Sequence, residues 1–158
     1  MTTCLLGLIT ARLDFPKQPR TDLEEMTNSS IKLKRAYEPL TPVDGTSFLV
    51  ERLWPRGVKK TDLHVEAWLK DVGPSTALRR WFGHDPKKWS EFRRRYFHEL
   101  SANVDALEPI IKASRRGRVT LVYSSRDMEH NNAVALKDYV ESRLLNKKRH
   151  SGEAAKKA

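Results

Sequence analysis

Three short stretches of the chain have the hydrophobic pattern of β-strands. In residues 31–36, the side chains of Ile31, Leu33 and Arg35 alternate with those of Lys32, Lys34 and Ala36, which is the period of two expected for a strand. Residues 47–53 contain the apolar run Phe48 to Val50 followed by Leu53, which is typical of a buried strand in a parallel sheet. Residues 119–123 read Val-Thr-Leu-Val-Tyr, and all five are good strand formers. We expect the second strand to stop at Trp54-Pro55, because proline has no N–H for the hydrogen-bond ladder.

Apolar residues recur at helical spacing elsewhere, between recognisable start and stop signals. The clearest start is Asp85-Pro86, which combines a capping acid with proline at the first helical position. Trp89, Phe92 and Tyr96 then recur on one face, as in an amphipathic helix packed on a core. Helices are predicted over the following ranges: residues 61–70, 75–82, 86–100 and 105–116, and a last helix after the turn of residues 124–129.

Strands separated by helices favour an α/β fold with a small, mainly parallel sheet flanked by helices. Three strands make a small sheet, and the ambiguous alternation over residues 64–69 leaves room for a fourth. The chain has 158 residues, a length typical of one domain that can bury a core without disulfides. We therefore expect a single compact domain, over residues 31–146.

Both ends of the chain differ from this core in composition. Residues 1–30 contain two prolines and no sustained period, and they are predicted to be a disordered or non-native extension. The formal net charge is +10, and half of this excess lies on residues 143–158. Residues 147–158 are therefore predicted to be a basic, disordered tail. Such a tail is typical of a solubilising end, and alternatively of a segment that binds nucleic acid or another polyanion.

Several classes of protein are disfavoured by the sequence. The one cysteine, Cys4, cannot form an internal disulfide, and no apolar run approaches the roughly 20 residues that span a bilayer. We therefore expect a cytoplasmic protein without membrane contact. The five histidines show no metal-ligand spacing, and no Gly-rich phosphate loop is present. No metal and no cofactor are expected.

Candidate chemistry lies in the two segments that follow the second and third strands. In parallel sheets, ligands bind outside the carboxyl ends of the strands. If these strands are neighbours, Arg52 and Arg56 face Ser124, Ser125 and the start of the last helix across one crevice. Guanidinium groups, hydroxyls and free helical N–H groups together form an anion site.

The candidate residues divide into binding and proton-transfer roles. The predicted ligand-binding residues are Arg52, Trp54, Arg56, Ser124, Ser125 and Asn131, with Arg35 and Arg79 as helpers. No catalytic residue is assigned, but Asp127 and His130 are candidates for proton transfer. A structural reading competes with these roles: Trp54 as a packed corner, Arg52 as an ion-pair partner and Asp127 as a helix cap.

The same two segments carry a resemblance to a known family. The motifs that carry it are Val50 to Gly57 (Val-Glu-Arg-Leu-Trp-Pro-Arg-Gly), Pro74-Ser75-Thr76, His84, Phe92 to Tyr96, Leu121 to Ser124, and Asn131 with Ala133. Over residues 31–144 the chain resembles the YeaO-like branch of the family called "domain of unknown function 488". The resemblance implies a compact α/β domain in which the two strand-end segments face each other, and it implies no established activity.

Two departures limit what the resemblance implies. A branch of the wider family has cysteines after the last strand, where this chain has Tyr123 and residues 131–133, so thiol or metal chemistry is not carried over. Many relatives have histidine at the position of Asn132, and His130 stands two positions earlier. His130 is thus a weaker catalytic candidate than its location suggests.

Three functions remain, in order of preference. The first is a domain that binds, or binds and processes, a small phosphate- or nucleotide-like anion in the crevice at the strand ends. The second is a nucleic-acid-binding or regulatory protein that uses the basic helices and tail. The third is a non-catalytic scaffold with structural arginines.

Overall fold

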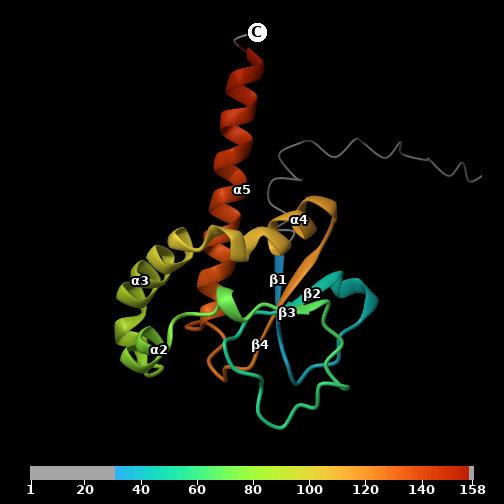
Figure 1. The fold of residues 1–158 in the computed structure, drawn as a ribbon, viewed down its shortest axis with the longest axis vertical. Helices are drawn as coiled ribbons and strands as arrows, with labels where there is room; N and C mark the ends of the chain where they lie inside the picture. Colours follow the sequence, from blue (N-terminus) through green and yellow to red (C-terminus); the bar gives the residue numbers. More distant parts are fainter. Residues whose placement is uncertain (1–30, 157–158) are drawn as a thin grey trace, which may run out of the picture.

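A computed structural model describes residues 31–156, with side chains through Lys147. Its single sheet has four parallel strands in the order β1-β4-β2-β3 (Figure 1). The strands are β1 (Ile31–Arg35), β2 (Thr46–Leu49), β3 (Ala67–Trp68) and β4 (Val119–Tyr123). The α/β fold with a small parallel sheet is confirmed, whereas the extension of residues 1–30 lies outside the described residues.

The central strand is the most apolar one, as expected for a strand covered on both faces. All five residues of β4 are buried. Its first residue, Val119, pairs with Ile31 of β1 on one side and with Thr46 of β2 on the other. Because β4 joins the two halves of the sheet, the loops that leave β1, β2 and β4 meet at one edge.

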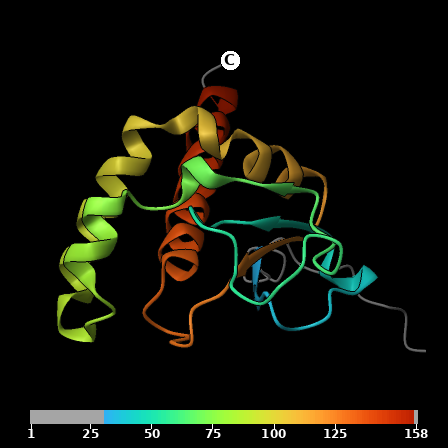
Figure 2. The same ribbon diagram turned by 60° about the horizontal axis from the view of Figure 1, so that its bottom comes forward.

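The helices cover one face of this sheet (Figure 2). They are α2 (Thr76–Phe82), α3 (Trp89–Ala102), α4 (Glu108–Arg116) and α5 (Asn132–Lys156). Within residues 31–156, four short 3-10 turns connect the elements, namely η1 (Pro42–Asp44), η2 (Lys70–Val72), η3 (Pro86–Lys88) and η4 (Val104–Leu107). The predicted helices over residues 75–82, 86–100 and 105–116 are thus confirmed, with short 3-10 turns at the starts of the last two.

The core divides into two clusters, one on each face of the sheet. The helical face buries Phe92, Tyr96 and Leu100 of α3 against Leu121 of β4, together with residues of the other helices. On the opposite face, a smaller cluster contains Leu49, Leu63 and Val122, with both Trp54 and Trp68 packed against it. The long segment after β2 covers this second face, and no helix does so within the described residues.

The predicted helix over residues 61–70 is wrong. This stretch contains turns followed by β3, whose Ala67 and Trp68 pair with Phe48 and Leu49 of β2. An extended chain lets Leu63 reach the second cluster and lets the Trp68 indole donate to the Glu51 carbonyl, 2.6 Å away. The fourth strand suggested by the alternation over residues 64–69 is therefore present, and burial overrides the capping signal at residues 61 and 62.

Capping residues at both ends fix the position of α2, which carries one residue of the site described below. Ser75 caps α2, and its hydroxyl accepts a hydrogen bond from the Leu78 amide at 3.1 Å. Gly83 ends the same helix in the left-handed conformation. Asp85 accepts from the Lys87 amide and starts η3, which leads directly into α3. Both the start and the end of α2 are therefore fixed by residues that the sequence identifies.

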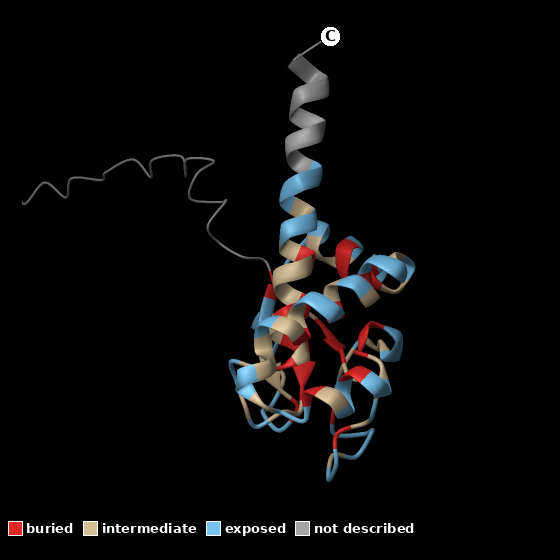
Figure 3. Cartoon of the chain, turned by 90° about the vertical axis from the view of Figure 1, so that its left-hand side faces the viewer, coloured by how far each residue is buried: buried red, intermediate tan, exposed pale blue. Residues whose placement is uncertain are grey.

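The last helix runs back along the sheet and extends beyond the other elements (Figures 1 and 3). Buried positions on it include Ala133, Leu136 and Val140, and none follows between Val140 and Lys147, the last residue whose side chain is described. The backbone is helical past residue 146, where the sequence analysis ended the core. None of the helices in the described part of the chain has the length and apolar character needed to cross a membrane.

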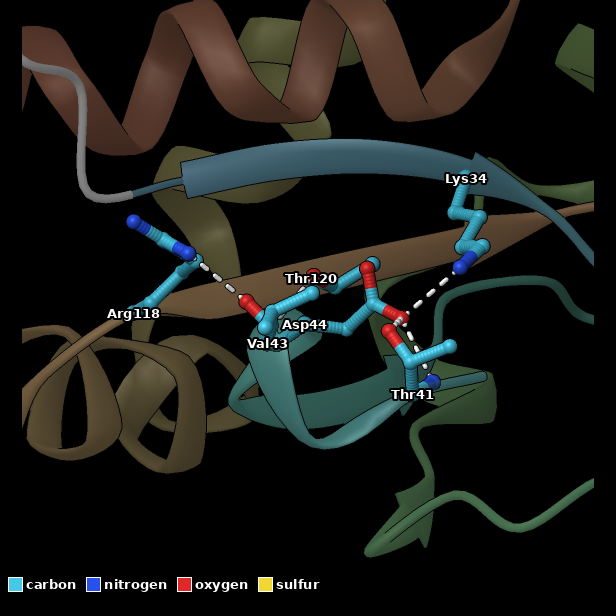
Figure 4. Close-up of polar contacts among 6 residues, drawn as sticks. All are labelled: Lys34, Thr41, Val43, Asp44, Arg118 and Thr120. Atoms are coloured by element: carbon cyan, nitrogen blue, oxygen red, sulfur yellow. Dashed lines mark hydrogen bonds and ion pairs between the residues drawn. The ribbon is translucent and has the colours of Figure 1, made fainter. Parts of the chain in front are cut away.

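A mostly buried ion pair fixes the connection between β1 and β2 (Figure 4). The Asp44 carboxylate accepts from the Lys34 ammonium at 2.7 Å and from the Thr41 amide at 2.7 Å. Hydrogen bonds from Lys34 and Thr41 lower the pKa of Asp44 to about 2, so the carboxylate is ionised at neutral pH. The Asp44 carbonyl accepts from the buried Thr120 hydroxyl, which ties the loop to β4.

The next residue has to be glycine. Gly45 has a φ of 69°, in the left-handed region, and a Cβ there would collide with the carbonyl oxygen of Arg118. The Asp44-Gly45 turn therefore combines a charged anchor with a close approach of two backbone segments.

Candidate functional site

A cavity of about 540 Å³ lies at the carboxyl edge of the sheet, where parallel α/β folds bind ligands. Its walls come from the loops after β2 and β4, from the turn before α2, and from α2, α3 and the start of α5. The lining residues are Glu51, Arg52, Leu53, Pro74, Arg79, Phe82, His84, Phe92, Ser124, Ser125, Arg126, Asp127, Asn131 and Asn132. The cavity is large enough for a molecule of nucleotide size.

Arg52 enters the cavity from the segment after β2. Its guanidinium donates to the carbonyls of Pro74 at 3.2 Å and Gly73 at 3.4 Å. Gly73 allows this approach, because a Cβ at that position would lie 2.8 Å from the Arg52 amide nitrogen. These two long hydrogen bonds orient the side chain and do not neutralise its charge. The ion pair of the competing structural reading is absent from the described residues.

Two further guanidinium groups reach the cavity from other elements. Arg79 lies in the middle of α2, and Arg126 lies on the loop after β4; both residues are exposed. Neither forms an ion pair with any residue that the structure describes. Three arginines from three separate elements thus surround one cavity, of which the sequence analysis identified Arg52 and Arg79 and missed Arg126.

The carboxylate of Glu51 is the main site residue that sequence reasoning missed. It accepts hydrogen bonds from the Ser124 amide at 2.8 Å and from the Ser124 hydroxyl. This contact joins the two strand-end segments directly, as the predicted crevice requires. In the sequence, Glu51 stands beside Arg52 and looks like its ion-pair partner, so only the pairing of β2 with β4 reveals its role.

Asp127 lines the cavity, but its carboxylate is engaged in a turn. It accepts from the amides of Glu129 and His130, each at 2.9 Å. These backbone hydrogen bonds lower the pKa of Asp127 below its usual value, so the group stays ionised at neutral pH. Asp127 therefore does not act as a proton donor at neutral pH, and it closes the turn that precedes α5 and does not cap the helix itself.

His130 does not line the cavity. Its ring nitrogen Nδ1 lies 3.1 Å from the Asp127 carboxylate, and its ring packs edge-on against Trp89, with centroids 5.4 Å apart. The side chain thus closes the turn and covers α3.

Asn131 lines the cavity wall and caps α5. Its side-chain oxygen accepts from the amides of Ala133 and Val134, and its amide group donates to the Asp127 carbonyl. Asn131 is 3% exposed, and these hydrogen bonds occupy both its amide oxygen and its amide nitrogen. The next residue, Asn132, donates to the Val50 carbonyl at 2.7 Å and joins α5 to β2, a contact that the sequence did not indicate.

Three other predicted binding residues lie away from the cavity. Trp54 packs edge-on against Trp68 in the second cluster, and its indole donates to the Val58 carbonyl. The exposed Arg56 follows in the same loop and does not line the cavity, contrary to the expectation that both Arg52 and Arg56 face Ser124 and Ser125 across one crevice. Arg35 ends β1 on the far side of β4.

The cavity also has an apolar wall and one residue in an uncommon conformation. Leu53, Phe82 and Phe92 supply the apolar surface. His84 has a φ of 58°, in the left-handed region that non-glycine residues rarely adopt. It is exposed at the cavity, directly after the glycine that ends α2.

The charges at the cavity favour an anion. Three guanidinium groups face two carboxylates, those of Glu51 and Asp127, and both carboxylates already accept hydrogen bonds from the protein. Within the described residues, no group of three or more histidine, cysteine or acidic side chains is placed to hold a metal ion.

Comparisons with known proteins identify relatives over most of the chain. A family described as the inactive DUF488-N3 subclade matches residues 30–157. The uncharacterised protein YeaO of Escherichia coli (strain K12) is 37% identical over 113 residues, which cover 72% of this chain and 98% of that protein. The uncharacterised protein Rv3073c of Mycobacterium tuberculosis (strain H37Rv) is 38% identical over 113 residues, with 72% and 95% covered. No solved structure matches the chain.

Proposed function

The chain belongs to the DUF488 family, in the subclade described as inactive, and we propose that it binds a small phosphate- or nucleotide-like anion without turning it over. The ligand occupies the cavity at the carboxyl edge of the sheet. Arg52, Arg79 and Arg126 hold its anionic group, and the Ser124-Ser125 segment and Glu51 contact its polar remainder.

One observation carries this proposal. Three guanidinium groups from three elements surround one cavity, and none of them forms an ion pair with a described residue. A guanidinium group presents several donors in a planar fork that fits phosphate and carboxylate oxygens. Structural arginines are typically matched by nearby carboxylates, as Arg93 is by Asp138 at 2.7 Å. Arg79 and Arg126 instead leave their donors available to a bound anion, and Arg52 offers the N–H groups that do not donate to Pro74 and Gly73.

The remaining lining narrows the ligand class. Leu53, Phe82 and Phe92 offer apolar surface to a ring, and the Glu51 carboxylate offers an acceptor to a hydroxyl or amino group. A nucleotide-like molecule combines these features with a phosphate. Inorganic phosphate alone would use the arginines but not the apolar wall, so it would bind more weakly.

Three polar residues of the cavity support binding more than chemistry. The Ser124 hydroxyl donates to Glu51, the Asp127 carboxylate is held ionised by backbone amides, and Asn131 is occupied as a helix cap. General acid–base catalysis needs a group that can change its protonation near neutral pH. The description of the subclade as inactive agrees with a binding role.

A thermal-shift experiment on the full chain tests the proposal. The probes are AMP, inorganic pyrophosphate, glucose 6-phosphate and, as a macromolecular probe, a 20-base-pair DNA duplex. For a dissociation constant of about 0.1 mM, 10 mM ligand stabilises the folded state by about 2.7 kcal/mol. We expect a rise in Tm of roughly 8 °C with AMP, because about 1 kcal/mol shifts a domain of this size by about 3 °C.

Each outcome of this experiment has a defined meaning. A rise with AMP or pyrophosphate that exceeds the rise with sodium chloride at equal ionic strength supports the cavity. A response to the DNA duplex alone, lost as salt is raised, would instead favour the nucleic-acid-binding alternative. If no phosphate compound changes Tm, the arginines are structural and the proposal is wrong.

A further inference from the structure

One residue of the cavity wall has a backbone conformation that its residue type rarely adopts. His84 has a φ of 58°, and it is the one non-glycine residue with a positive φ in the described part of the chain. It follows Gly83, which ends α2 with a φ of 55°. Glycine would take up the second position at a lower cost in free energy as well, because it has no Cβ to collide with the backbone in the left-handed region.

Hydrogen bonds on both sides of His84 fix the turn that carries it. The Gly83 amide donates to the Arg79 carbonyl at 3.1 Å. The Asp85 amide donates to the Phe82 carbonyl at 3.0 Å. A costly backbone conformation persists only where its surroundings determine it, and such residues cluster at ligand sites. The turn therefore holds the His84 side chain in one place at the cavity.

The imidazole of His84 has little role in holding the fold together. The residue is exposed and lines the cavity, and its ring forms no hydrogen bond or ion pair with any residue that the structure describes. It makes one ring contact there, a tilted one with Phe82, whose centroid is 6.1 Å away at an interplanar angle of 55°. The fold would thus favour glycine at this position, and the cavity is what the imidazole faces.

The exposed surface available to a ligand ring comes mainly from His84 and Leu53. Phe82 and Phe92 also line the cavity, but they are only 4% and 2% exposed, so most of their surface is already covered. Leu53 is 59% exposed and comes from the segment after β2. His84 is the one exposed aromatic ring among the residues that line the cavity, and an aromatic ring is the kind of side chain on which bases stack.

We propose that His84 selects a ligand that carries a nucleobase, by stacking its imidazole on the base while the arginines hold the phosphate. This inference rests on the proposed function, and it names the part of the ligand that a sugar phosphate lacks. Every base has a π-face, so stacking is tolerant of base identity. His84 therefore distinguishes nucleotides from sugar phosphates, and does not distinguish one base from another.

The test compares AMP with ribose 5-phosphate, which carries the same phosphate but no base, by isothermal titration calorimetry on the full chain. We expect the wild type to bind AMP at least tenfold more tightly. His84→Gly and His84→Asn both suit the left-handed backbone and remove the aromatic ring. Each should weaken AMP binding by about tenfold, the typical effect of losing one stacking side chain, and change ribose 5-phosphate binding by less than about twofold.

Two controls separate recognition of the ring from other effects. His98→Asn makes the same change at an exposed position of α3 outside the cavity, and it should leave both affinities unchanged. Arg79→Ala should weaken the binding of both ligands, because both carry the phosphate. The Tm of His84→Gly should equal or exceed that of the wild type; a lower Tm in both His84 variants would show that the imidazole serves the fold and would contradict the inference.

The binding results distinguish failure of this inference from failure of the proposed function. If the wild type binds AMP and both His84 variants bind it equally well, the cavity proposal stands and the role of His84 is wrong. Equal losses for AMP and ribose 5-phosphate would mean that His84 contacts the phosphate, which also overturns the inference. If the wild type binds neither ligand, the proposed function is wrong and the inference fails with it.

Discussion

Replacing Asp44 with alanine is expected to lower the free energy of unfolding by about 3 kcal/mol, because it leaves the Lys34 ammonium without its partner in a mostly buried position. The side chains of Lys34 and Asp44 are only 16% and 11% exposed. The same change removes the acceptor of the Thr41 amide and so loosens the loop before β2. Urea unfolding of the full chain, followed by circular dichroism, measures the effect.

An exposed ion pair supplies the control for this prediction. The Lys112–Glu108 pair on α4 is 3.5 Å long, and its side chains are 62% and 50% exposed. Glu108→Ala should therefore cost less than about 1 kcal/mol. An Asp44→Ala variant as stable as Glu108→Ala would show that the Asp44 network does not hold the fold.

The same carboxylate gives the protein a defined sensitivity to acid. Because the pKa of Asp44 is lowered from 3.8 to about 2 by folding, its contribution is fully present above pH 3.8 and is lost as pH falls toward 2. The shift corresponds to about 2 kcal/mol. The difference in stability between the wild type and Asp44→Ala should shrink across this range. A difference that stays constant from pH 5 to pH 2 would contradict the assignment.

Replacing Arg79 with alanine is expected to weaken binding of AMP by about tenfold or more. Charge-assisted hydrogen bonds contribute about 1.5–3 kcal/mol each, and 1.4 kcal/mol is a factor of ten in affinity. Arg79 is exposed on α2 and has no ion-pair partner among the described residues, so its removal should leave stability nearly unchanged. Isothermal titration calorimetry with AMP measures the change.

The neighbouring residue provides a matched control. Arg80 lies on the same helix, is equally exposed and carries the same charge, but it does not line the cavity. Arg80→Ala should change the affinity for AMP by less than about twofold, since an exposed charge outside the cavity is largely screened by salt. Equal losses in Arg79→Ala and Arg80→Ala would mean that net charge, and not the cavity, determines binding.

Most of the fold could be predicted from the sequence, because local signals and burial agree there. The buried run of β4, the capping residue Ser75 and the face of α3 all behave as their patterns indicate. The error at residues 61–70 arises where the two disagree. The capping signal at residues 61 and 62 favours a helix. In the structure, Leu63 instead packs in the cluster on the second face of the sheet, and Trp68 pairs with β2 as part of β3.

The site could be predicted only in part, for a geometric reason. The sequence identifies residues that follow strands, and this was sufficient for Arg52, Ser124 and Ser125. It does not indicate which way a loop turns after the strand, so Arg56 was included although it does not line the cavity. It also cannot pair residues across strands, which is how Glu51 meets Ser124.

The most direct test of the anion cavity is a titration of the ¹⁵N-labelled full chain with AMP, followed by amide chemical shifts. We expect saturable shifts at Ser124, Ser125 and Arg126, together with residues 79–84 of α2 and the turn that follows it, because these amides surround the cavity. The AMP concentration that half-saturates these shifts should be at least tenfold higher in Arg79→Ala and unchanged in Arg80→Ala. Shifts confined to the basic end of α5, or none at any amide around the cavity, would contradict the proposal that this cavity binds the anion.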